Sequence, residues 1–224
     1  MSNAVTWNLD WRKIEEQLTA DGSKLPRVAI ETGTCRGNGT RALAQRFERV
    51  ITIELRETLH LEARARLTGA EFSHVEFVQG NSAVELPGIL RRTSDSESLF
   101  FFLDAHWSGD QSVDWKSSKW HGYGFDTAHL GTVGITPSGP EQCPLIEELT
   151  AIVEHCRAPA IVLIDDLKSL PPDGSGLKNH EFNGEDWSHL SREKLLSIVR
   201  ARLRRAVEFR NPLQWLLLLN ARSI

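Results

Sequence analysis

The sequence predicts an α/β fold: a doubly wound, mostly parallel sheet of seven strands with helices on both faces and a C-terminal antiparallel hairpin. Short apolar runs alternate with longer amphipathic segments, the pattern of repeated strand–helix–strand units that build a parallel sheet. The runs at 99–103 and 160–164 are apolar throughout, as expected of central strands covered on both faces. The last two runs are separated by Asn211-Pro212, a connection short enough for a hairpin.

Local composition assigns the individual elements. β-branched and apolar side chains mark the strands, whereas apolar residues four apart, such as Leu43 and Phe47, mark one face of a helix. Pro144 suits a first helical turn, where its missing N–H leaves no bond unmade, and Pro87 marks a weak point in another helix. The predicted elements are, in chain order, a helix at 7–18, a strand at 27–31, a helix at 40–47, a strand at 49–54, a helix at 57–67, a strand at 75–78, a helix at 83–92, a strand at 99–103, a helix at 144–155, a strand at 160–164, a helix at 191–203, and strands at 206–210 and 214–220.

One domain over residues 25–224 is expected, preceded by an N-terminal helical lead-in over 1–24. An insertion loop over 107–142 and the segment 168–190 show no periodicity, and loops this long are usually functional or disordered. Both follow the carboxyl ends of predicted strands, where open α/β sheets bind ligands. We therefore expect the functional site at that edge of the sheet.

Composition and charge limit the partners and the cell compartment that we expect. The 224 residues carry 26 Lys and Arg against 30 Asp and Glu, and this net charge of −4 argues against a nucleic-acid partner. The longest apolar runs are too short to span a bilayer, and three cysteines are too few for a disulfide framework or a zinc site. A cytoplasmic protein without a membrane partner is expected. The segment with Trp7 and Trp11 could cap the site or form the contact of a homodimer.

A glycine-rich segment follows the first predicted strand. Glycines at 33, 37 and 39 allow a tight turn and a close approach to a ligand, but their spacing fits neither the dinucleotide fingerprint nor the phosphate loop. Glu54 ends the second strand, 54 − 33 = 21 residues after Gly33, where an acid can accept hydrogen bonds from ribose hydroxyls. The structural alternatives are a plain glycine-rich turn and a surface glutamate.

Over roughly residues 25–222 the chain resembles the class I, Rossmann-like S-adenosylmethionine (SAM)-dependent methyltransferases. Their motif acid-x-Gly-x-Gly-x-Gly is matched by Glu31, Gly33, Cys35 and Gly37, with Cys35 in place of the middle glycine, and Glu54 matches their ribose-binding acid. Gly80-Asn81-Ser82 lies where the family often has Gly-Asp-Ala beside the adenine. The resemblance implies SAM as cofactor, with contacts from Glu31, Gly33, Thr34, Cys35, Gly37, Glu54, Asn81, Ser82 and Asp104.

Three acids follow the two central strands. Asp104 comes after the fourth strand, and Asp165 and Asp166 after the fifth, so all three can meet at one edge of the sheet. Carboxylates this close repel one another unless a cation lies among them. The arrangement is similar to that of metal-dependent catechol-type O-methyltransferases, which implies that these acids hold Mg²⁺. The alternative for Asp165 and Asp166 is helix capping.

His106 is the candidate general base or an additional metal ligand, because a neutral imidazole accepts a proton near physiological pH; a hydrogen-bonded structural histidine is the alternative. Aromatic side chains of the insertion loop suit a flat or sugar-like substrate, or else a partner interface. These side chains are Trp107, Trp115, Trp120, His121, Tyr123, Phe125 and His129. A basic run at Arg200, Arg202, Arg204 and Arg205 is interpreted as a solvated face.

The sequence thus favours a SAM-dependent methyltransferase acting on a small molecule, at oxygen, assisted by Mg²⁺ at Asp104, Asp165 and Asp166. His106 and Asp104 are its candidate catalytic residues. The alternative is a non-catalytic, nucleotide- or partner-binding Rossmann-like module. Neither interpretation identifies the methyl acceptor.

Overall fold

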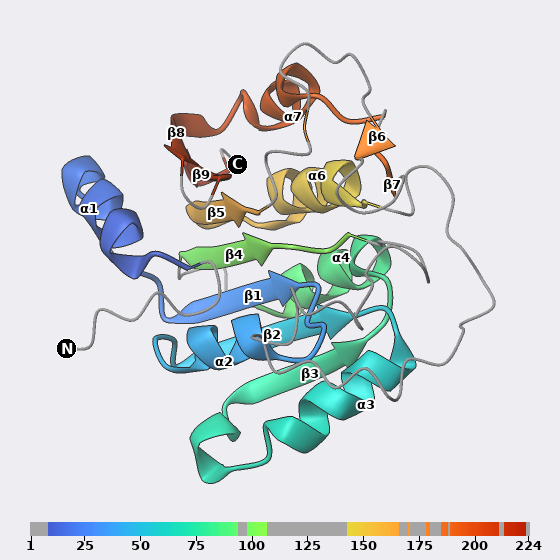
Figure 1. Ribbon diagram of the computed structural model, residues 1–224. Coiled ribbons are helices and arrows are strands. Elements are labelled where there is room, and N and C mark those ends of the chain that lie inside the picture. The colour runs from blue at the N-terminus through green and yellow to red at the C-terminus, as the bar shows by residue number, and fades with distance from the viewer. Residues whose placement is uncertain are drawn as a thin grey trace.

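The computed structural model describes residues 9–93, 98–106, 143–165, 170, 178–179, 185–187, 189–210 and 213–222. Its main sheet contains β1 (Val28–Thr32), β2 (Arg49–Glu54), β3 (Val75–Gln79), β4 (Leu99–Leu103), β5 (Ala160–Ile164), β8 (Leu203–Arg210) and β9 (Leu213–Leu219). The spatial order is β3-β2-β1-β4-β5-β9-β8 (Figure 1). The first five strands are parallel, whereas β9 is antiparallel to both β5 and β8. The predicted seven-stranded, mostly parallel sheet with its terminal hairpin is confirmed.

Helices cover both faces, because alternate residues of each strand point to opposite sides. They are α1 (Trp11–Asp21), α2 (Asn38–Ala44), α3 (Glu57–Arg66), α4 (Ser82–Arg92), α6 (Leu145–His155) and α7 (Arg192–Val199), with a short 3₁₀ turn η1 (Ala70–Phe72). Residues of α1 and α2 share one core with Phe100 and Phe102 of β4. Residues of α4, α6 and α7 share the other core with Leu99, Phe101 and Leu103. The central strand β4 is therefore buried on both faces, as predicted.

Trp11 packs inside its own chain. Its side chain is 4% exposed, and its ring centroid lies 5.8 Å from that of Phe47 and 5.9 Å from that of Phe100. In Figure 1, α1 lies at the amino ends of the parallel strands, away from their carboxyl edge. Trp11 therefore belongs to the core of its own chain and does not cap the site. Trp7 lies outside the described residues, and a homodimer contact of this segment stays a prediction.

The basic run is a solvated face only in part: Arg200 and Arg204 are exposed, as predicted, whereas Arg202 is buried. Arg202 is 5% exposed, and its guanidinium donates hydrogen bonds of 2.7–3.1 Å to five backbone carbonyls. These carbonyls belong to Ile152, Val153, Cys156, Ala158 and Asn220. Arg204 pairs with Asp21 at the end of α1. The arginines thus tie the C-terminal strands to α6 and α1. Helix α7 ends at Val199 and β8 begins at Leu203, whereas the prediction extended the helix to 203.

Other boundaries differ locally. Helix α2 begins at Asn38 and ends at Ala44, against a prediction of 40–47. Two short strands, β6 (Lys178–Asn179) and β7 (Glu185–Asp186), pair antiparallel within a segment predicted to be a loop. The predicted insertion loop over 107–142 lies outside the described residues.

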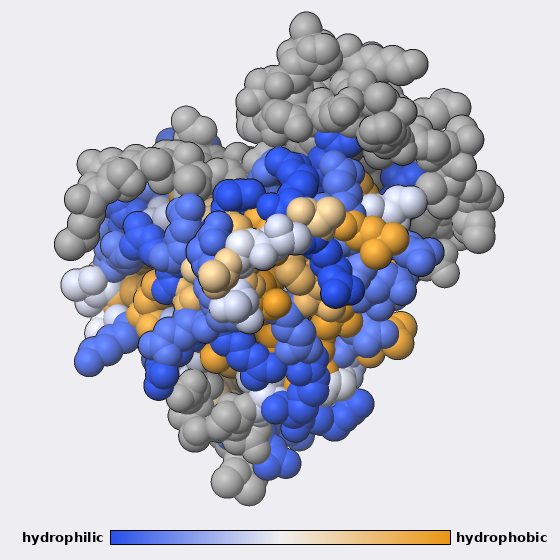
Figure 2. Space-filling view, turned by 90° about the horizontal axis from the view of Figure 1, so that it is seen from below, coloured by the Kyte–Doolittle hydropathy of each residue, from blue (hydrophilic) through white to orange (hydrophobic). Residues whose placement is uncertain are grey.

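The described surface is mainly hydrophilic. Viewed from below Figure 1, hydrophobic residues come to the surface between larger hydrophilic areas (Figure 2). Leu55, Leu61 and Val84 are large hydrophobic side chains that are exposed, by 43%, 55% and 69%. Within the part of the chain that is described, none of the helices has the length and apolar character needed to cross a membrane.

Candidate functional site

The loop between β1 and α2 contains backbone φ angles that few residue types adopt. Gly33 has a φ of +85°, and a Cβ atom there would lie 2.4 Å from the carbonyl oxygen of Asp104, so only glycine fits. Gly37 has a φ of +79°. Cys35, at the position of the family's middle glycine, adopts a φ of 49°, which non-glycine residues seldom do. The loop therefore curls as a glycine motif would, although its central residue carries a side chain.

Glu54 is connected to this loop. Its Oε2 accepts a 2.7 Å hydrogen bond from the backbone N–H of Cys35, and its Oε1 accepts one of 2.9 Å from that of Arg56. Burial raises the pKa of Glu54, which is 7% exposed. Each carboxylate oxygen has a further lone pair, so Glu54 can still accept hydrogen bonds from two ligand hydroxyls. The predicted ribose acid thus lies directly beside the glycine loop.

The surroundings of the Cys35 thiol keep it protonated. Burial, together with the negative charge of Glu54, raises the pKa of Cys35 to about 12. The side chain is therefore a neutral thiol at physiological pH, and it offers no thiolate nucleophile. Its part in the site is the backbone N–H that it donates to Glu54.

Glu31 and Thr34 lie behind the loop rather than at its open surface. Glu31 Oε2 accepts hydrogen bonds from Thr40 Oγ1 at 2.5 Å and Thr52 Oγ1 at 2.6 Å, and Thr52 Oγ1 shares a further hydrogen bond with Thr34 Oγ1 at 2.5 Å. All four side chains belong to residues exposed by 3% or less. Burial raises the pKa of Glu31 to about 7. The side chains of Glu31 and Thr34 therefore stabilise the loop from the protein interior. From the sequence, both had been expected to contact the cofactor directly.

Asn81 and Ser82 begin α4 at the carboxyl end of β3. Asn81 Oδ1 accepts a 2.9 Å hydrogen bond from the N–H of Ala83 and so caps the helix. Ser82 Oγ donates to Glu148 Oε1 of α6 at 2.5 Å. The half-buried Asn81 remains close to the edge of the sheet, whereas the Ser82 hydroxyl points into the protein between two helices.

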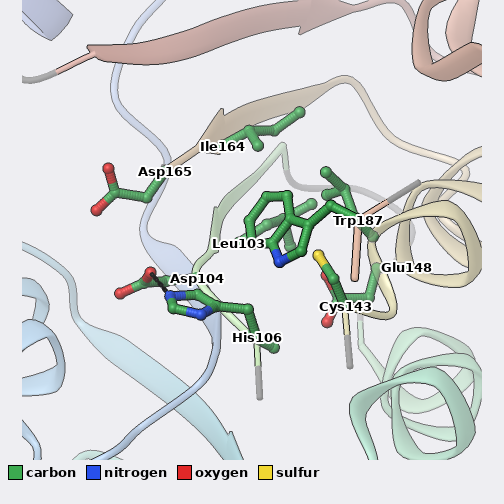
Figure 3. A pocket seen from close by; sticks show the side chains of 10 residues that line it. Leu103, Asp104, His106, Cys143, Glu148, Ile164, Asp165 and Trp187 are labelled. Carbon is green, nitrogen blue, oxygen red and sulfur yellow. Dashed lines mark ion pairs between the residues drawn. The ribbon is translucent and has the colours of Figure 1, made fainter. Parts of the chain in front are cut away.

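A small pocket opens at the carboxyl ends of β4 and β5 (Figure 3). It is lined by Leu103, Asp104, Ala105, His106, Cys143, Leu145, Glu148, Ile164, Asp165 and Trp187. His106 Nε2 lies 3.8 Å from Asp104 Oδ1, with the side chains 15% and 17% exposed, so this pair is at the mouth. The ring of Trp187 packs against the His106 ring, with centroids 5.6 Å apart. The predicted catalytic residues are therefore adjacent and partly exposed.

Two residues at the inner end of this pocket were missed by the sequence analysis. Trp187 is 2% exposed, and its indole Nε1 has no hydrogen-bond partner within the described structure. Glu148 is 1% exposed, and burial raises its pKa to about 7 although Ser82 donates to it. A sequence signal existed for Glu148, because it falls on the apolar stripe of α6 between Leu145, Leu149 and Ile152. Trp187 gave no comparable signal.

The described acids do not form the predicted metal site. Asp165 is 6% exposed, and its Oδ1 accepts a 3.0 Å hydrogen bond from Gln214 Nε2. Asp104 faces His106, and Asp166 lies outside the described residues. Among the residues that are described, no group of three or more His, Cys, Asp or Glu side chains could hold a metal ion. The described acids are therefore only part of the predicted ligand set, and the Mg²⁺ site stays a prediction that depends on Asp166.

Comparison with solved structures identifies the fold. The O-methyltransferase of Bacillus cereus, in complex with SAH, is similar with a TM-score of 0.55 and 14% identity over 97% of this chain and 81% of that chain. The O-methyltransferase TomG of Streptomyces achromogenes, in complex with SAM, is similar with a TM-score of 0.51 and 16% identity over 88% of this chain and 74% of that chain. A putative O-methyltransferase of Klebsiella pneumoniae is similar with a TM-score of 0.51 and 13% identity over 98% of this chain and 81% of that chain. No protein-family model and no curated protein matches the sequence. The chain therefore has the Rossmann-like fold of SAM-dependent methyltransferases, as the sequence resemblance implied.

Proposed function

We propose that this protein is a SAM-dependent methyltransferase that methylates an oxygen atom of a small molecule. The observation that carries the proposal is the hydrogen bond from the Cys35 N–H to Glu54, which joins the glycine loop and the ribose acid into one unit. The fold places this unit at the carboxyl edge of the sheet, where ligands bind in open α/β proteins. The net charge of −4 favours a small-molecule acceptor over nucleic acid.

The residues present fit SAM as the cofactor. Glu54 accepts hydrogen bonds from the ribose hydroxyls, and the backbone of Gly33 to Gly37 borders the remainder of the ligand. Leu55, which is 43% exposed beside Glu54, offers an apolar contact for the base, and Asn81 adds a polar one at the next strand end. When bound, SAM supplies a methyl group already activated by its sulfonium charge. The protein then has to position the acceptor and remove its proton.

His106 is the proposed general base. Its imidazole lies at the pocket mouth and takes the hydroxyl proton as the acceptor oxygen attacks. The Asp104 carboxylate, 3.8 Å from Nε2, stabilises the imidazolium that forms. Trp187 fixes the orientation of the ring by packing on it. Positioning alone can contribute about 7–11 kcal/mol to such a transfer.

Assistance by Mg²⁺ is the finer form of the proposal, and it depends on Asp166 joining Asp104 and Asp165. Within the described chain, Asp165 is bonded to Gln214 and Asp104 faces His106. We therefore assign the proton transfer to His106 and route no step through a metal ion.

The decisive experiment measures binding and transfer separately. Calorimetry should show SAM binding, and incubation with a panel of phenols, alcohols and carboxylic acids should release S-adenosylhomocysteine with at least one acceptor. His106→Gln should keep SAM affinity and reduce turnover about 10²- to 10⁴-fold. SAM binding without transfer to any acceptor would favour the non-catalytic module, and the absence of SAM binding would refute the methyltransferase proposal.

A further inference from the structure

We propose that Trp187 and Glu148 form a recognition subsite that binds a hydroxyl group of the acceptor, separate from the oxygen that is methylated. The proposal deepens the proposed function and rests on it, because it takes the molecule that binds here to be the methyl acceptor. Its basis is the juxtaposition, in one pocket, of an unpaired buried donor and a buried carboxyl group.

The donor is the indole N–H of Trp187. A buried N–H without a partner loses its hydration and gains no bond, which makes it costly to keep. Trp187 is 2% exposed, its Nε1 has no partner within the described structure, and its ring lines the pocket. Figure 3 shows the indole nitrogen on the side of the ring that faces Cys143 and His106. A ligand atom that accepts a hydrogen bond would satisfy it.

The acceptor is the carboxyl group of Glu148. One of its oxygens accepts from Ser82 at 2.5 Å, and a carboxylate has about four lone-pair positions. Among the described residues that line the pocket there is no arginine or lysine, and the basic side chain of His106 lies at the mouth. The buried carboxylate is therefore stabilised at the inner end by neutral donors such as Ser82. A ligand group that donates a hydrogen bond would do so.

A hydroxyl is the simplest group that does both, because its oxygen accepts while its proton is donated. The rest of the inner wall is apolar, formed by Leu103, Leu145 and Ile164 with the Cys143 side chain. The enclosed part of the pocket measures about 10 Å³, which admits a hydroxyl group but no ring, so an apolar body attached to that hydroxyl lies toward the mouth. With Asp104 and His106 at the mouth, a molecule held by its inner hydroxyl presents its outer part to the proposed base.

The test uses phenol, anisole and toluene as probes on the whole protein without SAM. Phenol both donates and accepts, anisole only accepts, and toluene does neither. In ¹⁵N-labelled protein, Trp187→Phe identifies the Trp187 indole resonance, and this resonance should move saturably with phenol. Calorimetry should rank phenol above anisole and anisole above toluene, each step about three- to tenfold, the value of one hydrogen bond.

Matched variants locate the effect. Trp187→Phe keeps the ring against His106 but removes the N–H. Anisole should therefore fall to the toluene level, whereas phenol should lose one step and stay above toluene through its hydrogen bond to Glu148. Trp11→Phe makes the same chemical change in the opposite core and should leave the ranking intact. Glu148→Gln should reduce the preference for phenol over anisole.

Three outcomes would overturn the proposal: an unmoved Trp187 resonance, equal binding of the three probes, or an unchanged ranking in Trp187→Phe. Each would mean that the N–H is satisfied by buried water only. Because no step uses SAM, failure here leaves the methyltransferase proposal standing, and failure to bind SAM leaves this result standing.

Discussion

The two halves of the carboxyl edge differ in how their acids, hydroxyls and N–H groups are hydrogen-bonded. Around the glycine loop, Glu31, Thr34, Thr52 and Glu54 are bonded to one another or to the loop backbone. At the ends of β4 and β5, the Trp187 N–H is unpaired within the described structure. In the first half these acids and hydroxyls are paired within the protein, whereas the second half presents an indole N–H to the pocket that a ligand can satisfy. This difference separates a preorganised cofactor cradle from a pocket that selects its ligand.

The variant with the largest expected effect tests how tightly the glycine loop packs against the end of β4. Gly33→Ala should destabilise the fold by about 2–5 kcal/mol, because left-handed strain adds to overpacking against the Asp104 carbonyl oxygen. Gly22→Ala is the matched control: its φ is also positive, +74°, but nothing lies within 4 Å of the added Cβ. Urea unfolding of both variants measures the difference. Equal losses would mean that the contact with β4 contributes nothing.

The second prediction tests the pocket through pH. The folded-state pKa of Glu148 is raised from 4.5 to about 7, so between these values the folded protein keeps a proton that the unfolded chain has released. The contribution of this group is thus fully present below pH 4.5, is lost as the pH rises toward 7, and stays lost above it. The shift corresponds to roughly 3 kcal/mol.

Glu148→Gln removes this titration, so the stability of the variant relative to the original chain should rise between pH 4.5 and 8. Glu31 has a similarly raised pKa, but it is present in both proteins and cancels in the difference. Glu154→Gln, at an exposed position of the same helix, is the control. Chemical unfolding at pH 4.5, 6 and 8 gives the comparison, and a pH-independent difference would contradict the buried, protonated state.

The third prediction addresses the cofactor half alone. Glu54→Gln should weaken SAM binding about ten- to a hundredfold, because the ribose loses a charged acceptor and one of the two loop N–H groups loses its partner. Phenol binding at the pocket should not change. Calorimetry with each ligand checks both statements. An unchanged SAM affinity would remove Glu54 from the site.

The smallest expected effect concerns metal. Once an acceptor is known, EDTA should leave turnover within about twofold, since the described acids are engaged by Gln214 and His106. Turnover that falls with EDTA and returns with Mg²⁺ would instead establish the metal-assisted form and make Asp166 the first residue to change.

The sequence predicted the sheet because its strands are apolar runs of distinctive composition, and β2, β4 and β5 have the predicted bounds. It located the glycine loop and Glu54 for a similar reason, since spacing along the chain fixes which segments meet. It could not show where individual side chains point. Glu31 belongs to the matching motif, yet strand alternation turns it toward Thr40 and Thr52.

Buried charge caused the remaining errors. Arg202 was interpreted as solvated because arginine usually is, but five carbonyls satisfy its guanidinium inside the protein. Glu148 was overlooked for the opposite reason: a single acid within an apolar stripe did not disturb the helical pattern. Whether such a group has partners depends on distant segments, and these are not visible in local sequence.

The position of β9 sets the order in which the sheet can be completed during synthesis. β9 lies between β5 and β8, so β8 emerges first but has no neighbour in the sheet until β9 follows. The backbone carbonyls at the end of α6 likewise lack their hydrogen-bond donor until Arg202 has been synthesised and has folded against them. At ribosomal speeds the 18 residues from Arg202 to Asn220 take about 1–4 s. During that interval the nascent chain exposes β5 as an open strand edge, which makes this stage the one at which chaperone binding or aggregation competes with folding.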